Sequence, residues 1–194
     1  MIGHQLTTLR IRRAAKRSLL KVAVGAADVR ADGWVGTDRE HIDLTDRSTW
    51  ARFFSEGSVD AMVAEHVWEH LTHEDAELAA QNCRHFLKTG GHIRIAVPDG
   101  YFPDAQYLEV VRPGGTGPGC EDHKVLYTYR TLCDLFSSQG FEVRLLEYWD
   151  EAGIFHTEPW SDVDGLIRRS GKHDPRNSGG RLRYTSLILD AIKR

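Results

Sequence analysis

A glycine and an acid near the start of the chain have the types and spacing of a nucleotide site. Gly25 follows the apolar run KVAV, and Asp38 ends the run WVGTD, 13 positions further on. A glycine lets the backbone approach a ligand closely, and an acid after the next strand can accept both hydroxyl hydrogens of a ribose. Either residue alone would be read as a turn residue. Together they predict a site that holds a nucleoside.

Further polar side chains follow other predicted strands. Asp43 lies in the short run HIDL, Glu65 and His66 end the run VDAMVAEH, and Asp99 follows HIRIAVP. In an open α/β sheet, ligands bind beyond the carboxyl ends of the strands, where the strand order reverses. We therefore expect these side chains to gather at one edge of a sheet.

The elements that must position these residues alternate along the chain. Strands are predicted over residues 21–24, 34–38, 41–44, 59–66, 92–98, 141–149 and 184–193, and helices over 5–19, 48–54, 73–91 and 129–140. Most of the strands are continuous apolar runs, which are typical of a mostly parallel sheet covered on both faces. We predict a single α/β domain over residues 1–194, with a basic helix within residues 1–20.

Two connections are unusual. The stretch ADVRADG between the first two strands is too short for a full crossover helix and must be a bare loop, unlike the plan of dinucleotide-binding dehydrogenases. Residues 150–182 are rich in glycine, proline and charge. Long irregular segments in compact α/β domains tend to be lids or substrate loops, so we expect such a role here, with a surface excursion as the alternative.

Composition limits the classes of protein. The 194 residues suffice for one domain with a real core, and the net charge of -3 favours no polyanionic partner, so nucleic acid is not expected. No apolar run approaches the length that spans a membrane. The three cysteines have no paired spacing, which suits a reducing compartment, and we expect a cytoplasmic protein.

Several motifs, in order and at matching spacing over most of residues 21–193, resemble one family. They are GAADVRADGWVGTD with HIDL, then AEHVWEHLTHEDAELAAQNCRHFLKTGGHIRIAVPD, then DHKVLYTYRTLCDLFSSQGFEV, and finally YTSLILDAIK. The chain is similar to compact, small-molecule class I S-adenosylmethionine-dependent methyltransferases of the type 11 kind. The resemblance implies a Rossmann-like α/β fold. Its seven-stranded, mostly parallel sheet would have an antiparallel last strand and helices on both faces.

The resemblance also implies roles for single residues. The residues expected to bind S-adenosylmethionine are Gly25, Ala27, Asp38, Asp43, Leu44, Glu65 and His66. Asp38 would hold the ribose, Asp43 and Leu44 would border the adenine, and Glu65 and His66 would lie near the methionine part. The candidate catalytic residues are His123, His66 and Asp99, with His123 the first candidate for the base that deprotonates a hydroxyl or amine of a small acceptor.

Two other functions stay open. Ala27 stands where the family has glycine, which favours a non-catalytic relative that keeps the fold as a binding or scaffold module. The segment HVWEH matches the inverted zinc-hydrolase motif, which would use His66 and His70, but it needs a helical frame and a distant third ligand. We expect no metal ligands, and a homodimer stays open.

Overall fold

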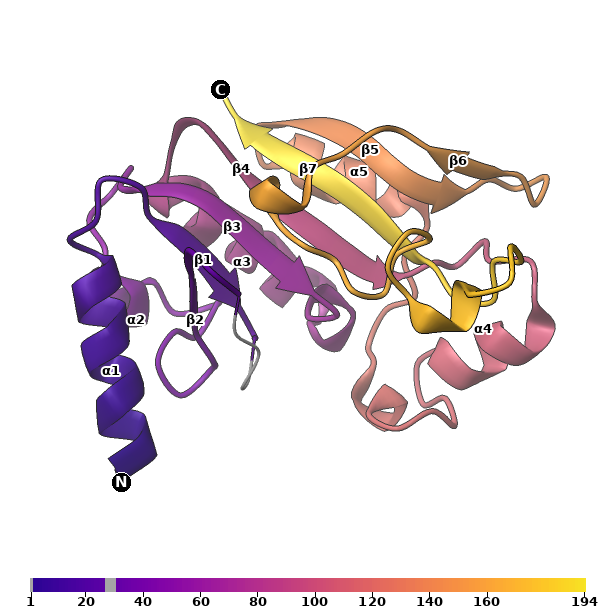
Figure 1. The fold of residues 1–194 in the computed structure, drawn as a ribbon, viewed down its shortest axis with the longest axis horizontal. Helices are drawn as coiled ribbons and strands as arrows, with labels where there is room; N and C mark the ends of the chain where they lie inside the picture. The colour runs from indigo at the N-terminus through magenta and orange to yellow at the C-terminus, as the bar shows by residue number, and fades with distance from the viewer. Residues whose placement is uncertain (1, 27–30) are drawn as a thin grey trace.

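The structure is a computed structural model that describes residues 2–26 and 31–194. Its strands are β1 (Lys21–Val24), β2 (Trp34–Gly36), β3 (Val59–Glu65), β4 (Leu87–Pro98), β5 (Phe141–Trp149), β6 (Phe155–Thr157) and β7 (Ser186–Lys193). They form one seven-stranded sheet in the order β2-β1-β3-β4-β7-β5-β6 (Figure 1). The α-helices are α1 (Ile2–Ala14), α2 (Arg47–Ala51), α3 (His73–Phe86), α4 (Ala105–Val111) and α5 (Tyr129–Ser138).

The strand directions confirm the predicted architecture. Strand β1 is parallel to β2 and β3, and β3 is parallel to β4. The last strand, β7, is inserted between β4 and β5 and is antiparallel to both. The order reverses at β1, so the carboxyl ends of β1, β2 and β3 meet at a switch point where ligands bind in such sheets.

Three predictions of secondary structure are wrong. Residues 41–44 form turns instead of a strand, and the seventh strand is β6, inside the segment predicted to be irregular. The predicted helix 73–91 ends at Phe86, and the chain runs directly into β4. Leu87 is fully buried opposite Val59, so pairing with β3 outweighs continuation of the helix.

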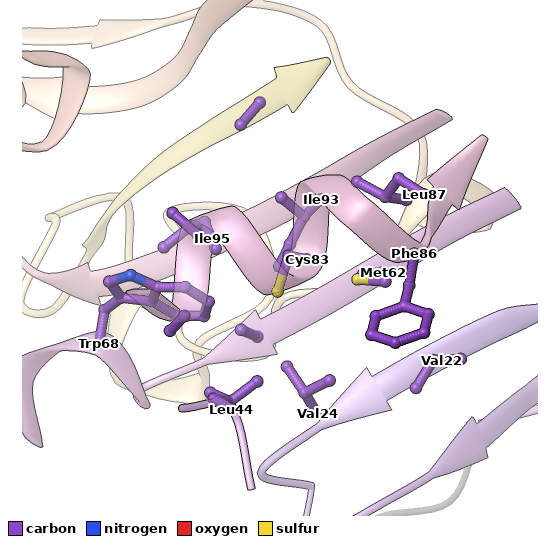
Figure 2. Packing of buried hydrophobic residues seen from close by; sticks show 14 of the residues in the cluster. Val22, Val24, Leu44, Met62, Trp68, Cys83, Phe86, Leu87, Ile93 and Ile95 are labelled. Atoms are coloured by element: carbon purple, nitrogen blue, oxygen red, sulfur yellow. The ribbon is translucent and has the colours of Figure 1, made fainter. Parts of the chain in front are cut away.

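Helix α3 shows how the main core is built. The side chain of Thr72 accepts a hydrogen bond from the Asp75 amide and so caps the first turn, which also carries acidic residues. Its buried positions recur at helical spacing and include Cys83 and Phe86, which face the strands (Figure 2). The Phe86 ring also stacks on Trp50 of α2 at 5.3 Å.

The opposite face of the sheet is covered differently. Helices α3 and α5 lie behind the sheet in Figure 1, whereas residues 158–171, here called the wall segment, pass in front of β4 and β7. A small apolar cluster joins the wall segment to the sheet through Ala96, Leu146, Ile167 and Ile188.

A buried arginine fixes the wall segment. Arg94 of β4 is 2 % exposed and makes a bidentate ion pair with Asp190 of β7, at 2.7 and 2.8 Å. Its third nitrogen donates to the carbonyls of Ser161 and Gly165, both at 2.7 Å. Among the described residues, no helix is long and apolar enough to cross a membrane.

Candidate functional site

Two cavities open at the carboxyl ends of the parallel strands. Cavity A, of about 330 Å³, lies between β1, β3 and the wall segment and is lined by Glu65, Arg168 and Arg169 among others. Cavity B, of about 360 Å³, is lined by residues that include Asp38, Asp43 and Leu44. Gly25 and His66 line both cavities, so the two spaces meet at these residues.

Gly25 forms the floor between the cavities. Its φ is +60°, a conformation that costs a residue with a side chain roughly 1–2 kcal/mol. A Cβ added here would lie 2.6 Å from Cγ2 of Val67, so there is no space for it either. The next residue is tied to β2, because the Ala26 amide donates to the Thr37 carbonyl at 2.9 Å. Ala27, predicted to contact the donor, lies outside the described residues.

Asp38 lies two residues after the end of β2 and is exposed at cavity B. Its Oδ1 accepts from the Arg39 amide at 2.7 Å, and its carbonyl accepts from the amides of His41 and Ile42. The residue therefore starts a turn while its carboxylate stays at the rim of the cavity.

Asp43 and Leu44 form the adjoining side of cavity B. Burial alone would raise the pKa of Asp43, but hydrogen bonds from Thr45 and the charge of Arg39 outweigh it and lower the pKa below its usual value. The Asp43 carbonyl accepts from the Trp50 indole at 3.0 Å. The backbone here is held rigidly and presents Leu44 as an apolar edge.

Glu65 and His66 end β3. Oε1 of Glu65 accepts from the Arg169 amide at 2.7 Å and so joins β3 to the wall segment. His66 has φ +56°, the one positive φ among the described residues other than glycine. Its Nε2 lies 2.9 Å from the Ser186 hydroxyl, and its ring stacks near Tyr184. A strained, well-held residue of this kind is typical of functional sites.

His123 lies next to His70, which lines cavity B. It is buried, and its Nδ1 lies 2.7 Å from the carbonyl of Val111. Because a carbonyl only accepts, Nδ1 carries a proton, and the tautomer that this bond selects has its lone pair on Nε2. The His70 ring packs edge-on against it at 4.8 Å, and His70 also lines cavity B.

Asp99 is placed differently from the other candidates. It is fully buried, and its two carboxylate oxygens accept from the amides of Tyr101 and Trp149 at 2.9 and 2.8 Å. Burial raises the pKa of Asp99 to about 6 against these bonds. It lies outside the lining of cavities A and B and ties the end of β4 to the end of β5.

The structure thus brings most of the predicted donor residues together at cavity B, with Glu65 on cavity A. Among the residues without a role assigned from the sequence above, Val67 lines cavity B, and Arg168 and Arg169 line cavity A from a long irregular segment.

Comparison with known proteins agrees with this arrangement. Residues 31–95 match the family model described as a methyltransferase domain. A search of curated proteins finds no match. The fold is shared with an S-adenosylmethionine-dependent methyltransferase from Mesorhizobium loti, with a TM-score of 0.53 and 14% identity over 96% of this chain and 98% of that chain.

Two further solved structures are similar. One is an S-adenosylmethionine-dependent methyltransferase from Thermotoga maritima described as a "possible histamine N-methyltransferase", with a TM-score of 0.52 and 13% identity over 100% of this chain and 92% of that chain. The other comes from a complex with the Haloferax volcanii Trm112 methyltransferase activator, with a TM-score of 0.52 and 13% identity over 98% and 90% of the two chains. At these identities the similarity shows the shared fold.

The residues present fit the methyl donor that this fold implies. Gly25 lines cavity B without a side chain, and Asp38 offers a carboxylate to the same cavity, which is the pattern for a nucleoside ligand. Residues 31–95 thus match a methyltransferase domain, and the chain has the fold of S-adenosylmethionine-dependent methyltransferases.

Proposed function

We propose that this protein methylates a hydroxyl or amine of a small molecule, with the donor in cavity B. One observation carries the proposal. All the described candidates for donor binding except Glu65 line cavity B, and His70, on the same cavity, packs against His123. The cavity proposed to hold the nucleoside of the donor therefore lies beside a pair of imidazoles.

Each residue of cavity B has a task in this proposal. Asp38 accepts the ribose hydroxyls, Asp43 and Leu44 border the adenine, and Gly25 lets the backbone approach. His66 lies where cavity B meets cavity A, which suits the boundary between the donor and the acceptor. The bound donor supplies an activated methyl group. The protein's contribution is mainly to align the acceptor with it.

His123 is the proposed proton acceptor for the hydroxyl or amine. The Val111 carbonyl holds the proton on Nδ1, so the Nε2 lone pair is free to take the proton that the acceptor loses. His66 is second, because its Nε2 already lies at the Ser186 hydroxyl. Asp99 is third, because both of its oxygens accept from backbone amides.

The proposal is tested at Asp38. Asp38→Ala removes charge-assisted hydrogen bonds worth about 1.5–3 kcal/mol each, so the affinity for S-adenosylhomocysteine should fall at least about tenfold in a calorimetric titration. Asp134→Ala is the control, since Asp134 is an exposed acid on α5, away from cavity B. Equal affinity in a folded Asp38→Ala variant would contradict the role of Asp38. No binding by the parent protein at millimolar ligand would favour the non-catalytic alternative.

A second measurement tests the base. His123→Gln keeps a polar side chain of similar size but has no basic nitrogen. We expect this variant to bind S-adenosylhomocysteine normally and to lose about 10²–10⁴-fold in the rate of methyl transfer, the usual contribution of a general base. Unchanged turnover with an accepted substrate would exclude His123 as the base.

A further inference from the structure

Three side chains meet next to cavity B without a task in donor binding. Glu69 and His70 belong to the same short 3-10 turn, Trp68–His70, and His123 comes from the loop before α5. One ligating atom from each residue lies within 4.8 Å of the others. The two segments are held together by their backbones, because the Lys124 amide donates to the Glu69 carbonyl at 2.7 Å.

Glu69 has a buried carboxylate that lacks hydrogen-bond donors among the described residues. Its side chain is 1 % exposed, and neither oxygen accepts a hydrogen bond of regular geometry from the described residues. The nearest group that can carry a positive charge is Nδ1 of His66, at 3.0 Å from Oε1. Burying a charge in this way is costly unless it is paired or coordinates a metal ion.

The surroundings of Glu69 show the same deficit. The buried hydroxyl of Tyr127 also has no hydrogen-bond partner in the described part of the chain. Burial, and after it the charge of Glu69, raises the pKa of Tyr127 to about 12. Glu69 and Tyr127 together thus hold three buried oxygen atoms without a hydrogen bond from the described residues.

The two histidines are oriented as metal ligands usually are. Nδ1 of His123 donates to the Val111 carbonyl at 2.7 Å, and Nδ1 of His70 lies 3.6 Å from a carboxylate oxygen of Asp122. Ligating histidines almost always give their other ring nitrogen to a carbonyl or carboxylate, which fixes the tautomer and the ring. Both rings thus keep Nε2 for a ligand.

We propose that Glu69, His70 and His123 bind one divalent transition-metal ion of the zinc type. Two imidazoles and one carboxylate suit such an ion, whereas magnesium and calcium prefer oxygen ligands. Bonds of about 2.0–2.1 Å in a tetrahedral site place the ligand atoms about 3.4 Å apart. Because the atoms lie within 4.8 Å, small side-chain rotations close the site. Three protein ligands leave one position open to water or another ligand.

This ligand set differs from the inverted zinc-hydrolase motif seen in the sequence. That motif pairs His66 with His70 on an α-helix, but His66 has a positive φ and the residues after it form a 3-10 turn. His66 instead contacts Ser186 and Glu69. The structure replaces it with His123, which is distant in sequence.

This inference deepens the proposed function, and it rests on that function for placing the acceptor substrate next to His123. A metal ion lowers the pKa of a hydroxyl that it binds. In the metal-free protein the lone pair of His123 serves as the proton acceptor. In the loaded protein that lone pair is committed to the ion, and the ion takes over the task of favouring loss of the proton.

Direct metal binding by untagged, full-length protein tests the site. We expect calorimetric titration of the chelator-treated protein with Zn²⁺ to show one tight ion per chain, and Co²⁺ to give the visible absorption of a tetrahedral site. His70→Ala and His123→Ala should each weaken binding about a hundredfold, since loss of even an outer-shell partner costs about 10–100-fold. Asp122→Asn should weaken it about tenfold.

Controls separate this site from adventitious binding and from misfolding. His73→Ala removes an exposed histidine near the cluster and should leave Zn²⁺ affinity unchanged. His70 is one-third exposed, so His70→Ala should keep the native far-UV circular dichroism spectrum. The inference is wrong if the parent protein binds no ion, or if affinity is equal in the parent and in both ligand variants. A protein that binds S-adenosylhomocysteine but no metal would overturn this inference and leave the proposed function standing, and the reverse result would overturn the proposed function.

Discussion

Replacing Gly25 with alanine tests the floor of the two cavities. The residue has φ +60°, and the new Cβ would lie 2.6 Å from Cγ2 of Val67, 3.4 Å from Cγ1 and 3.6 Å from Cβ. The left-handed conformation costs alanine about 1–2 kcal/mol. Forcing a methyl group into packed space costs about 1–3 kcal/mol, and a branched valine has few rotamers with which to move away. We therefore expect Gly25→Ala to lower the free energy of unfolding by about 2–5 kcal/mol.

A double-mutant cycle with Val67→Ala separates the two costs. Truncating Val67 removes the methyl groups that the new Cβ would meet but leaves φ unchanged. In the Val67→Ala background, Gly25→Ala should cost only the conformational part, about 1–2 kcal/mol. The coupling between the two sites should thus be about 1–3 kcal/mol and favourable.

Urea denaturation at 25 °C, followed by circular dichroism, measures all four proteins of the cycle. The same proteins are titrated with S-adenosylhomocysteine, for which we expect weaker binding by Gly25→Ala because the loop must shift. A cost of Gly25→Ala below about 0.5 kcal/mol, the range of ordinary surface substitutions, would refute the strained-floor argument. If Gly25→Ala lowers the free energy of unfolding equally in both backgrounds, the clash with Val67 is refuted, but the conformational cost is not.

Three further predictions concern two buried charged groups and the irregular segment between β5 and β7. The pKa of Asp99, about 6 in the folded protein, exceeds its unfolded value of about 3.9, so its contribution to stability is complete below pH 4 and is lost as the pH rises through 6. Between pH 4 and pH 7, titration of Asp99 should lower the free energy of unfolding of the parent protein by up to about 3 kcal/mol, and Asp99→Asn should abolish this loss. The same pH dependence of stability in both proteins would argue against the raised pKa. Arg94→Ala should lower the free energy of unfolding in urea by about 3–5 kcal/mol because Asp190 stays buried without its partner, and a loss under 1 kcal/mol would contradict this. Within residues 150–183, limited digestion with trypsin should cut first after Arg181, which is exposed in a bend. Mass spectrometry identifies the first cut, and a first cut after Arg168 or Arg169 would contradict this prediction.

The fold could be predicted where local and tertiary preferences agree. The strands 92–98 and 141–149 are apolar runs bounded by glycine and proline, and α3 has both a cap and a buried stripe. Residues 41–44 look equally apolar, but Ile42 and Leu44 are buried from a turn instead of a strand. A segment can bury apolar residues without pairing with a neighbouring strand. Only the position of the neighbouring chain decides whether such a segment forms a strand or a turn.

The candidate site could be predicted in part for a similar reason. Gly25 and Asp38 follow β1 and β2, so the rule for strand ends places them together. The meeting of Glu69 with His123 depends on how the loop before α5 returns to the 3-10 turn, and no periodic pattern records that path. Asp99 satisfies the rule for strand ends, but in the structure its carboxylate bonds backbone amides.

The unequal covering of the two faces of the sheet affects how the native protein opens. One face buries a large apolar cluster under α3 and α5, whereas the wall segment is held by a small apolar cluster and by side chains that donate to its carbonyls, from Arg94, Lys21 and His92. Segments with few buried apolar contacts and exposed hydrogen bonds open locally, at free energies below that of global unfolding. Amide hydrogens of the wall segment should therefore exchange with solvent well before those of β3, β4 and β7. Cavity A lies between these two regions, so its entrance widens through a fluctuation that leaves the strand ladder intact.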